Sequence, residues 1–503
     1  MGFQTVQFWI GFALMFVLYW GVLNPLAERW GRRGIRLRNL GLLLASCLFY
    51  ASWDPWALTI IGASTVMDYL STQMMIRKGA RKRVWLGLSL IGNLGMLAAF
   101  KYFNFFIDSA ESLVNLLTGW DVATVRLDWV LPVGISFYTF QTLGYTLDVY
   151  AGKLRPESSF VSFFAFVSFF PQLIAGPIER GADLMPQFQT ARTFSSIEAR
   201  RSILRILWGL FKKLAIADRL AMFVNAGYAD IEGLTGVMAL CVVFAFTIQL
   251  YCDFSGYCDI AIGSAQLLGF NLSENFRRPL LAKSLQDLWQ RWHITIHRWF
   301  LEHIYLRLPR YRTKWGRARN VLIIFAISGL WHGASWNMVT WGVINGLLMM
   351  VLDGSVLKPL SQSRFFVFRK LGQFWGSSVV FLSLVFFRAP TWDDAVAMYM
   401  RLGTFFGTED RGSITSDFEN GLGLHPNEIA VGAFLVLLLY AIESFLEHKE
   451  ALANRVLRGP GFARWGMALG LGFAIVLLGN REVRPAVGSY KNMEDADFIY
   501  EQF

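Results

Sequence analysis

Histidines are the residues of this chain best suited to acid–base chemistry near neutral pH. The chain has six of them, and four lie in its apolar central region: His293, His297, His303 and His332. His332 stands in the run Gly329-Leu-Trp-His-Gly333, between apolar stretches at 320–327 and 338–351, where small neighbours leave room for a substrate. A neutral imidazole can take a proton from a hydroxyl that attacks a thioester and return it to the leaving thiolate. We therefore predict His332 as the general base of an acyl transfer; the alternative is a histidine held by hydrogen bonds in a helix interface.

His293 lies in the segment 290–297, whose aromatic and charged residues recur at helical spacing, so it is expected to face a protein interior near the cytoplasmic surface. It could orient His332, position a substrate or line the entry of a donor. His293 and His297 are four residues apart and could share one helix face at a metal site. The Glu of an H-E-x-x-H motif is absent and no cysteine cluster supports such a site, so we predict no metal.

Two carboxylates, Asp253 and Asp259, lie in an apolar run that also contains Ser255. They could contact a substrate, or they could be hydrogen-bonded anchors that tie a bent membrane helix to its neighbours. Further upstream, Glu179 and Arg180 follow a Gly-Pro pair at which a helix is expected to break. Their position predicts an ion pair or a substrate contact at that break.

The composition indicates a membrane protein. With 503 residues, 54% hydrophobic, 16% aromatic and 17% charged, the chain carries more apolar side chain than one soluble core can bury. A transmembrane helix needs roughly 20 mostly apolar residues. The stretches that meet this length are 7–24, 84–100, 236–252, 320–350, 431–446 and 463–479. The first has no basic region before it and no small-residue cleavage site after it, which predicts a retained helix and not a signal peptide.

Basic residues gather in short loops between the apolar stretches, at 29–38, 77–83 and 307–319. This is the distribution expected of cytoplasmic loops, and it accounts for the net charge of +11 without nucleic-acid binding. One crossing before the first loop puts the N-terminus on the outer side, where the acidic stretch 107–128 also falls. The four cysteines form no C-x-x-C pair and are expected to be small buried hydrophobes.

Two segments depart from simple crossings. The run 158–178 is rich in Phe and contains Pro171 and Pro177, which favours a broken or re-entrant helix. The stretch 198–225 mixes charges with apolar positions at helical spacing and predicts a helix that lies at the membrane interface or crosses close to one surface. No internal repeat is evident, which weighs against inverted-repeat transporters.

The whole pattern predicts an all-α polytopic integral membrane protein with roughly 10–12 transmembrane helices plus re-entrant and interfacial helices. Late in the chain it predicts a span at 367–387 and a Gly-rich loop at 407–424. We expect three parts: N-terminal transmembrane helices at 1–126, a catalytic core at 127–355, and C-terminal transmembrane helices with a tail at 356–503.

Several motifs in these segments resemble those of the membrane-bound O-acyltransferase (MBOAT) family, and most closely its bacterial branch typified by the alginate O-acetyltransferase membrane subunit. The likeness runs over most of the chain, with the motifs in the family's order. They are Leu131-Pro-Val-Gly-Ile-Ser-Phe-Tyr138, Phe170-Pro-Gln-Leu-Ile-Ala-Gly-Pro177, Asp253-Phe-Ser-Gly-Tyr257 with Asp259, Glu274-Asn-Phe276, Arg291-Trp-His293, Gly329-Leu-Trp-His-Gly333 and Phe386-Phe-Arg388.

The resemblance implies that His332 is the family's essential histidine, inside a central tunnel through a thinned part of the bilayer, and that His293 is the second polar residue of that tunnel. We predict both as catalytic residues. The predicted substrate-binding residues are Trp331, Asn337, Trp292, Arg291, Asp253, Ser255 and Asp259.

The resemblance further implies an enzyme of the bacterial cytoplasmic (inner) membrane with no bound cofactor. Its donor would be an acyl thioester, usually acetyl-CoA, that enters from the cytoplasm. The acyl group would be delivered to the outer face, where a serine acyltransferase partner commonly loads an exopolysaccharide or cell-wall polymer. A related branch uses a carrier-protein thioester and transfers D-alanine, so the motifs leave the donor open.

The chain departs from the alginate-type pattern at three places. His297-Arg298 replaces small polar residues, Leu306-Arg-Leu-Pro-Arg310 replaces a Gly-Gly-Asn-Arg turn, and Glu501 stands where an aromatic residue is expected. These changes concern the docking of the donor and the identity of the acceptor more than the type of reaction. The alternative function is a transporter or flippase whose broken helices, around 171–180 and 328–337, line a substrate path without covalent chemistry.

Overall fold

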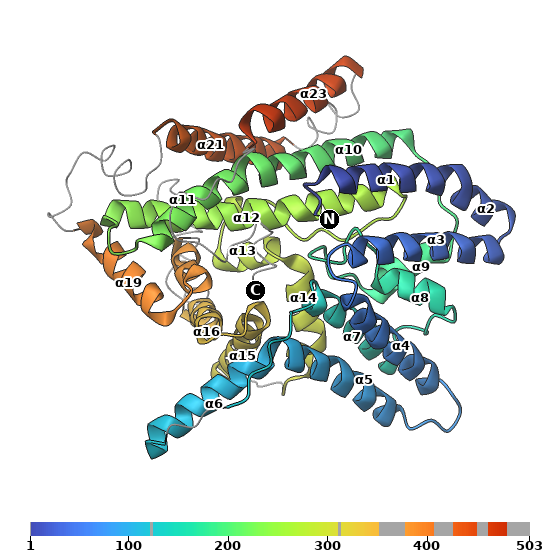
Figure 1. Cartoon of the computed structure of the whole chain (residues 1–503), viewed down its shortest axis with the longest axis horizontal. Helices are drawn as coiled ribbons and strands as arrows, with labels where there is room; N and C mark the ends of the chain where they lie inside the picture. Colours follow the sequence, from blue (N-terminus) through green and yellow to red (C-terminus); the bar gives the residue numbers. More distant parts are fainter. Residues whose placement is uncertain are drawn as a thin grey trace. The chain divides into compact units, whose positions relative to one another are not determined.

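The protein is described by a computed structural model in which residues 2–120, 124–309, 313–351, 378–406, 426–449 and 461–479 are placed. Every regular element in these ranges is a helix (Figure 1). The predicted loop at 407–424, the first part of the span at 367–387 and the C-terminal tail with Glu501 lie outside them.

Several of the described helices are suited to a bilayer by length and composition. Those long and apolar enough to cross it are Val6–Arg29, Lys82–Thr118, Gly236–Leu267 and Asn427–His448. Shorter apolar helices are Trp336–Val351, Ser378–Arg388 and Trp465–Leu478. The prediction of an all-α polytopic membrane protein is thereby confirmed.

The chain divides into two compact units. Unit 1 consists of Met1–Ile203 and Ile260–Glu274, and unit 2 of Leu204–Asp259 and Asn275–Phe503. The boundaries fall inside two helices, α10 (Ser196–Leu210) and α12 (Gly236–Leu267), and in the segment that follows α12. The three parts predicted from the sequence, 1–126, 127–355 and 356–503, do not correspond to these units and stay a prediction.

Unit 1 contains the first membrane helices, and within it α4, α5 and α7 pack against one another. The predicted broken helix is confirmed, because α8 ends at Val167 and residues 168–180 form turns and extended chain before α9 begins. The helices of this unit, besides the start of α10, are α1 (Val6–Leu18), α2 (Asn24–Arg29), α3 (Arg32–Ala51), α4 (Ala57–Met75), α5 (Lys82–Leu97), α6 (Phe103–Thr118), α7 (Ile135–Tyr150), α8 (Phe160–Val167) and α9 (Gly181–Phe188).

Unit 2 holds both candidate catalytic histidines. The stretch predicted as one amphipathic helix at 198–225 is continuous through α10, the π-helical turn η3 (Phe211–Ala217) and α11. The helices of the unit, besides parts of α10 and α12, are α11 (Asp218–Ala229), α13 (Leu285–Arg291), α14 (Ile294–His303), α15 (Lys314–His332), α16 (Trp336–Val351), Ser378–Arg388, α19 (Trp392–Gly403), α21 (Pro426–His448) and α23 (Gly461–Leu478).

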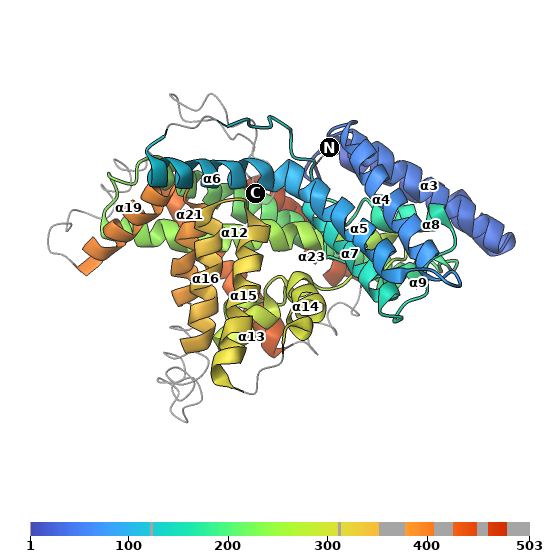
Figure 2. The same cartoon turned by 90° about the horizontal axis from the view of Figure 1, so that it is seen from below.

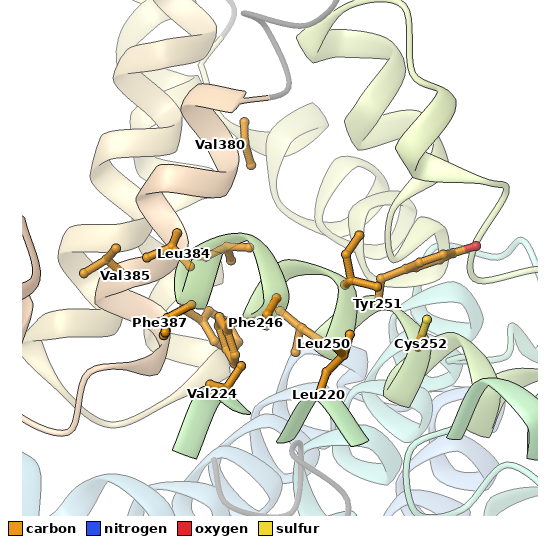
Figure 3. Close-up of a cluster of buried hydrophobic side chains, with 14 of the residues drawn as sticks. Leu220, Val224, Phe246, Leu250, Tyr251, Cys252, Val380, Leu384, Val385 and Phe387 are labelled. Atoms are coloured by element: carbon orange, nitrogen blue, oxygen red, sulfur yellow. The ribbon is translucent and has the colours of Figure 1, made fainter. Parts of the chain in front are cut away.

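The core of unit 2 is apolar and is built around α12. Phe246 and Leu250 on this helix face Val380, Leu384 and Phe387 of the helix Ser378–Arg388 (Figure 3). Helices α15 and α16 pack along each other as an antiparallel pair (Figure 2). The apolar stretches at 320–327 and 338–351 on either side of His332 are therefore parts of two helices.

Candidate active site

His332 is the last residue of α15, at the point where the chain turns into α16. Gly333 ends the helix, and its N–H donates to the carbonyl of Gly329 over 3.2 Å. Ser335 then starts α16 by accepting the N–H of Met338 at its hydroxyl oxygen over 3.3 Å. The small residues around His332 thus form the break between helices that the sequence predicts.

Glycines let α15 and α16 approach at backbone distance. A Cβ added to Gly329 would lie 2.2 Å from a carbonyl oxygen of α16, and one added to Gly342 would lie 2.2 Å from a carbonyl oxygen of α15. Both distances are far below a van der Waals contact, so a larger residue at either position must push the helices apart. Gly342 and Gly346 form a G-x-x-x-G pair, which lets membrane helices pack closely. Because His332 is the last residue of α15, we expect this close crossing to position it.

The imidazole of His332 is buried among aromatic rings, with 5% of the residue exposed. The ring centres of Trp331, Trp341 and Phe387 lie 4.8, 5.2 and 5.4 Å from its own. The ring of His293 lies 6.2 Å away. The two predicted catalytic residues are therefore close together within unit 2.

His293 occupies the N-cap position of α14, and its φ of +44° lies in the left-handed region that non-glycine residues rarely adopt. The idea that His293 and His297 share one helix is wrong, because the chain breaks between α13 and α14 and His297 alone is helical. Burial lowers the pKa of His293 well below its ordinary value, and the nearby His332 and His297 lower that pKa further. The ring is therefore neutral at pH 7.

A small apolar pocket shares two of its walls, Trp341 and Phe387, with the surroundings of His332. Trp292, the residue before His293, forms a third wall, and Leu250 of α12 a fourth. The cavity measures about 20 Å³, enough for one group the size of a water molecule or a methyl.

The polar residues of α12 that the sequence singles out contact basic residues of the neighbouring helical stretch. Two successive lysines of the π-helical turn η3, Lys212 and Lys213, both reach α12. The contacts are Asp253 with Lys213 at 2.7 Å, Asp259 with Arg205 at 2.8 Å and with Lys212 at 2.7 Å, and Ser255, which accepts from Lys212 at 2.7 Å. These ion pairs favour the anchoring role for the two carboxylates, and their contact with a substrate stays a prediction.

The remaining residues predicted to bind substrate also have defined contacts in unit 2. Arg291 donates to Asp287 over 2.8 Å and to Glu447 over 2.9 Å. Asn337 donates to the carbonyl of Ala389 over 3.0 Å. The buried rings of Trp331 and Trp292 lie against His332 and the pocket, respectively. Their roles toward a substrate likewise stay predictions.

Glu179, in unit 1, is buried where the broken helix ends. Its carboxylate accepts the backbone N–H of Ser273 over 2.5 Å and the hydroxyl of Ser273 over 3.0 Å. Burial raises the pKa of Glu179 to about 7, although both hydrogen bonds act to lower it. The side chain therefore joins two segments of unit 1, a role that the sequence does not reveal.

Comparison with known proteins places the sequence of this chain in a family. Residues 153–390 match the membrane-bound O-acyltransferase family. The chain is 34% identical to the probable alginate O-acetylase AlgI of Azotobacter vinelandii over 416 residues, which cover 82% of this chain and 81% of that protein. This chain belongs to the membrane-bound O-acyltransferase family. It is accordingly an O-acyltransferase and a multi-pass integral membrane protein.

Two further relatives of this MBOAT enzyme differ in the group or the polymer that they are named for. The chain is 36% identical to the peptidoglycan O-acetyltransferase of Helicobacter pylori over 373 residues, which cover 68% of this chain and 67% of that protein. It is 24% identical to the teichoic acid D-alanyltransferase of Streptococcus thermophilus over 309 residues, which cover 56% of this chain and 70% of that protein.

Sequence reasoning missed several residues that surround the MBOAT histidines. Trp341 and Phe387 line both His332 and the pocket. Trp341 lies in an apolar segment where one aromatic residue looks like any other, whereas Phe387 had a signal, since it lies inside the Phe386-Phe-Arg388 motif. Asn275 contacts His293, and its signal was present, since it is a polar residue inside the Glu274-Asn-Phe276 motif. Within the described ranges, no group of three or more His, Cys, Asp and Glu residues is placed to hold a metal ion.

Proposed function

We propose that this MBOAT enzyme takes an acetyl group from a cytoplasmic thioester, with acetyl-CoA as the first candidate, for delivery to hydroxyl groups of an exopolysaccharide or cell-wall polymer. Support comes from the relatives, whose names combine O-acetylation with alginate and with peptidoglycan. A carrier-bound thioester is the second candidate, since the resemblance includes a branch that transfers D-alanine and a teichoic acid D-alanyltransferase is among the relatives. We further propose that the enzyme resides in the bacterial cytoplasmic membrane with its N-terminus outward, because its basic loops then face the cytoplasm.

The observation that carries the proposal is the pair of buried imidazoles, His332 and His293, whose rings lie 6.2 Å apart in apolar surroundings. Neutral His332 takes the proton from a hydroxyl nucleophile as its oxygen attacks the thioester carbonyl carbon. The C–O bond forms, the C–S bond breaks, and the imidazolium returns the proton to the leaving thiolate, which departs as a thiol. His293 orients His332 or the substrate during this step.

The small size of the apolar pocket favours a short acyl group as the group that the enzyme transfers. Its volume of about 20 Å³ suits the methyl of an acetyl group, whereas a long acyl chain needs several times that space. The aromatic walls, Trp341 and Phe387, are shared with His332, so a methyl in the pocket would lie near the imidazole. On the outer face, a partner serine acyltransferase is proposed to pass the acetyl group to the polymer.

The experiment is thioester consumption by the purified protein in liposomes, with radiolabelled acetyl-CoA added outside and a hydroxyl-bearing oligosaccharide acceptor present on both sides of the membrane. The wild-type enzyme is expected to release free CoA, and His332→Ala is expected to abolish this release while still inserting and folding. His448→Ala is the matched control, since His448 is an exposed histidine at the end of α21. Near-normal CoA release by His332→Ala would contradict the catalytic role. Passage of intact labelled substrate without any CoA release would favour the transporter instead.

A further inference from the structure

Asn275 lies beside His293, and its side chain is fully buried. Its amide oxygen Oδ1 is 3.1 Å from Nδ1 of His293. The same oxygen accepts the backbone N–H of Thr295 over 3.2 Å and the hydroxyl of Thr295 over 3.0 Å. The amide nitrogen donates to Sγ of Cys258 over 3.5 Å. The amide is therefore held in one orientation between α12 and the start of α14.

These contacts determine which nitrogen of His293 carries the hydrogen. A backbone N–H can only donate, so the Asn275 atom that faces the N–H of Thr295 must be the oxygen. An amide oxygen can only accept, so the ring nitrogen that faces it must be protonated. Nδ1 of His293 therefore carries a hydrogen, and in the neutral ring the lone pair is on Nε2.

We propose that Asn275 is a positioning residue for acyl transfer, because it holds His293 as the Nδ1-protonated tautomer and so makes Nε2 the nitrogen that accepts a proton or a hydrogen bond. Such a partner behind a functional histidine selects the tautomer and the orientation of the ring. The consequence for acyl transfer rests on the proposed function, whereas the tautomer does not.

Asn275 also caps α14 in place of His293. The first N–H groups of a helix are usually satisfied by the side chain of the N-cap residue, but His293 makes no such bond. Asn275 provides both acceptors, since its backbone carbonyl accepts the N–H of Ile294 over 2.9 Å and its Oδ1 accepts that of Thr295. This arrangement releases the imidazole from capping its own helix and supports the left-handed backbone at His293.

The charge environment makes the proposal testable. Among the described residues, the titratable groups that act on His293 include His332 of α15 and His297 of α14, and Cys258 of α12 lies behind Asn275. The other rings in contact with His293 belong to Phe254, Phe276 and Trp331. A carboxylate at position 275 would therefore introduce an anion directly against Nδ1 of His293.

The first measurement is the tautomer itself, by ¹⁵N NMR of histidine-labelled protein in detergent, with the His293 signal assigned from its loss in His293→Gln. We expect a protonated Nδ1 and an unprotonated Nε2 near neutral pH. A neutral ring protonated on Nε2 would overturn the proposal. This result does not depend on activity, so a wild-type enzyme that consumes no thioester would count against the proposed function alone.

The second measurement is the pH profile of acetyl transfer by Asn275→Asp, which keeps an oxygen toward Thr295 and His293. The new carboxylate should raise the pKa of His293 by roughly 1–3 pH units, and the acid limb of the profile should move upward by the same amount. Asn320→Asp is the matched control, since Asn320 is a buried asparagine of α15 whose oxygen accepts from Arg319. If Asn275 only caps α14, the acid limb of Asn275→Asp stays with the control, and the proposal is wrong.

Discussion

Replacement of Gly342 by alanine tests whether the α15–α16 crossing positions His332. The new Cβ would lie 2.2 Å from the carbonyl oxygen of Phe325, where ordinary contacts begin at 3.4 Å. The obstacle is backbone and not a flexible side chain, so the two helices must separate by about 1 Å. His332 ends α15 and must move with it.

The expected magnitude follows from two opposing effects. Overpacking a tight contact costs about 1–3 kcal/mol, and exchanging glycine for alanine inside a helix returns about 1 kcal/mol. We therefore expect a net loss of about 0–2 kcal/mol of stability relative to wild type. The effect on catalysis should be larger, because a displacement of about 1 Å at a catalytic group can lower the rate by about 100-fold.

The assay combines thermal unfolding of the purified variant in detergent with CoA release in liposomes. Gly470→Ala is the matched control, because Gly470 lies in an apolar helix, α23, where an added Cβ meets nothing within 4 Å. Gly342→Ala should melt a few degrees lower and release CoA far more slowly than this control. If both variants melted and reacted alike, the close crossing would not be what positions His332.

Three further predictions concern ionisable residues other than the catalytic pair. Burial lowers the pKa of His297 to about 4, so between pH 6.5 and 4 the unfolded chain binds more protons than the folded one. The melting temperature of the wild type should therefore fall as the pH drops through this window. The melting temperature of His297→Gln should fall less over the same range. Lys213→Met removes the ion pairs of Lys213 with Asp253 and with Asp218 and should cost about 3–5 kcal/mol. Adding Asp253→Asn to Lys213→Met should restore only part of this loss in the same thermal assay, because Asp218 stays charged. Glu179→Gln keeps an acceptor for the backbone N–H of Ser273 and should melt within a few degrees of wild type at pH 7, whereas Glu179→Ala should melt lower; equal melting of the two would contradict the contact.

Local patterns in the sequence were sufficient to predict membrane helices, the broken helix and part of the candidate active site. The apolar stretches predicted membrane helices because hydropathy over a span depends on composition alone. Pro171 and Pro177 predicted the broken helix, since proline removes a backbone donor and glycine tolerates a turn. His332 was found because a histidine between glycines in an apolar region is unusual wherever the chain folds. The roles of the predicted substrate-binding residues stay untested.

What the sequence alone determined about this protein is its class, its membrane helices and the identity of two histidines that could perform acyl transfer. Only the tertiary structure decided how those histidines are held. The glycine contact between α15 and α16, the ion pairs from η3 to α12 and the amide of Asn275 behind His293 all join residues from different helices. Hydropathy and helical periodicity act along one segment at a time, whereas these contacts depend on the distance between segments, which arises only when the helices pack.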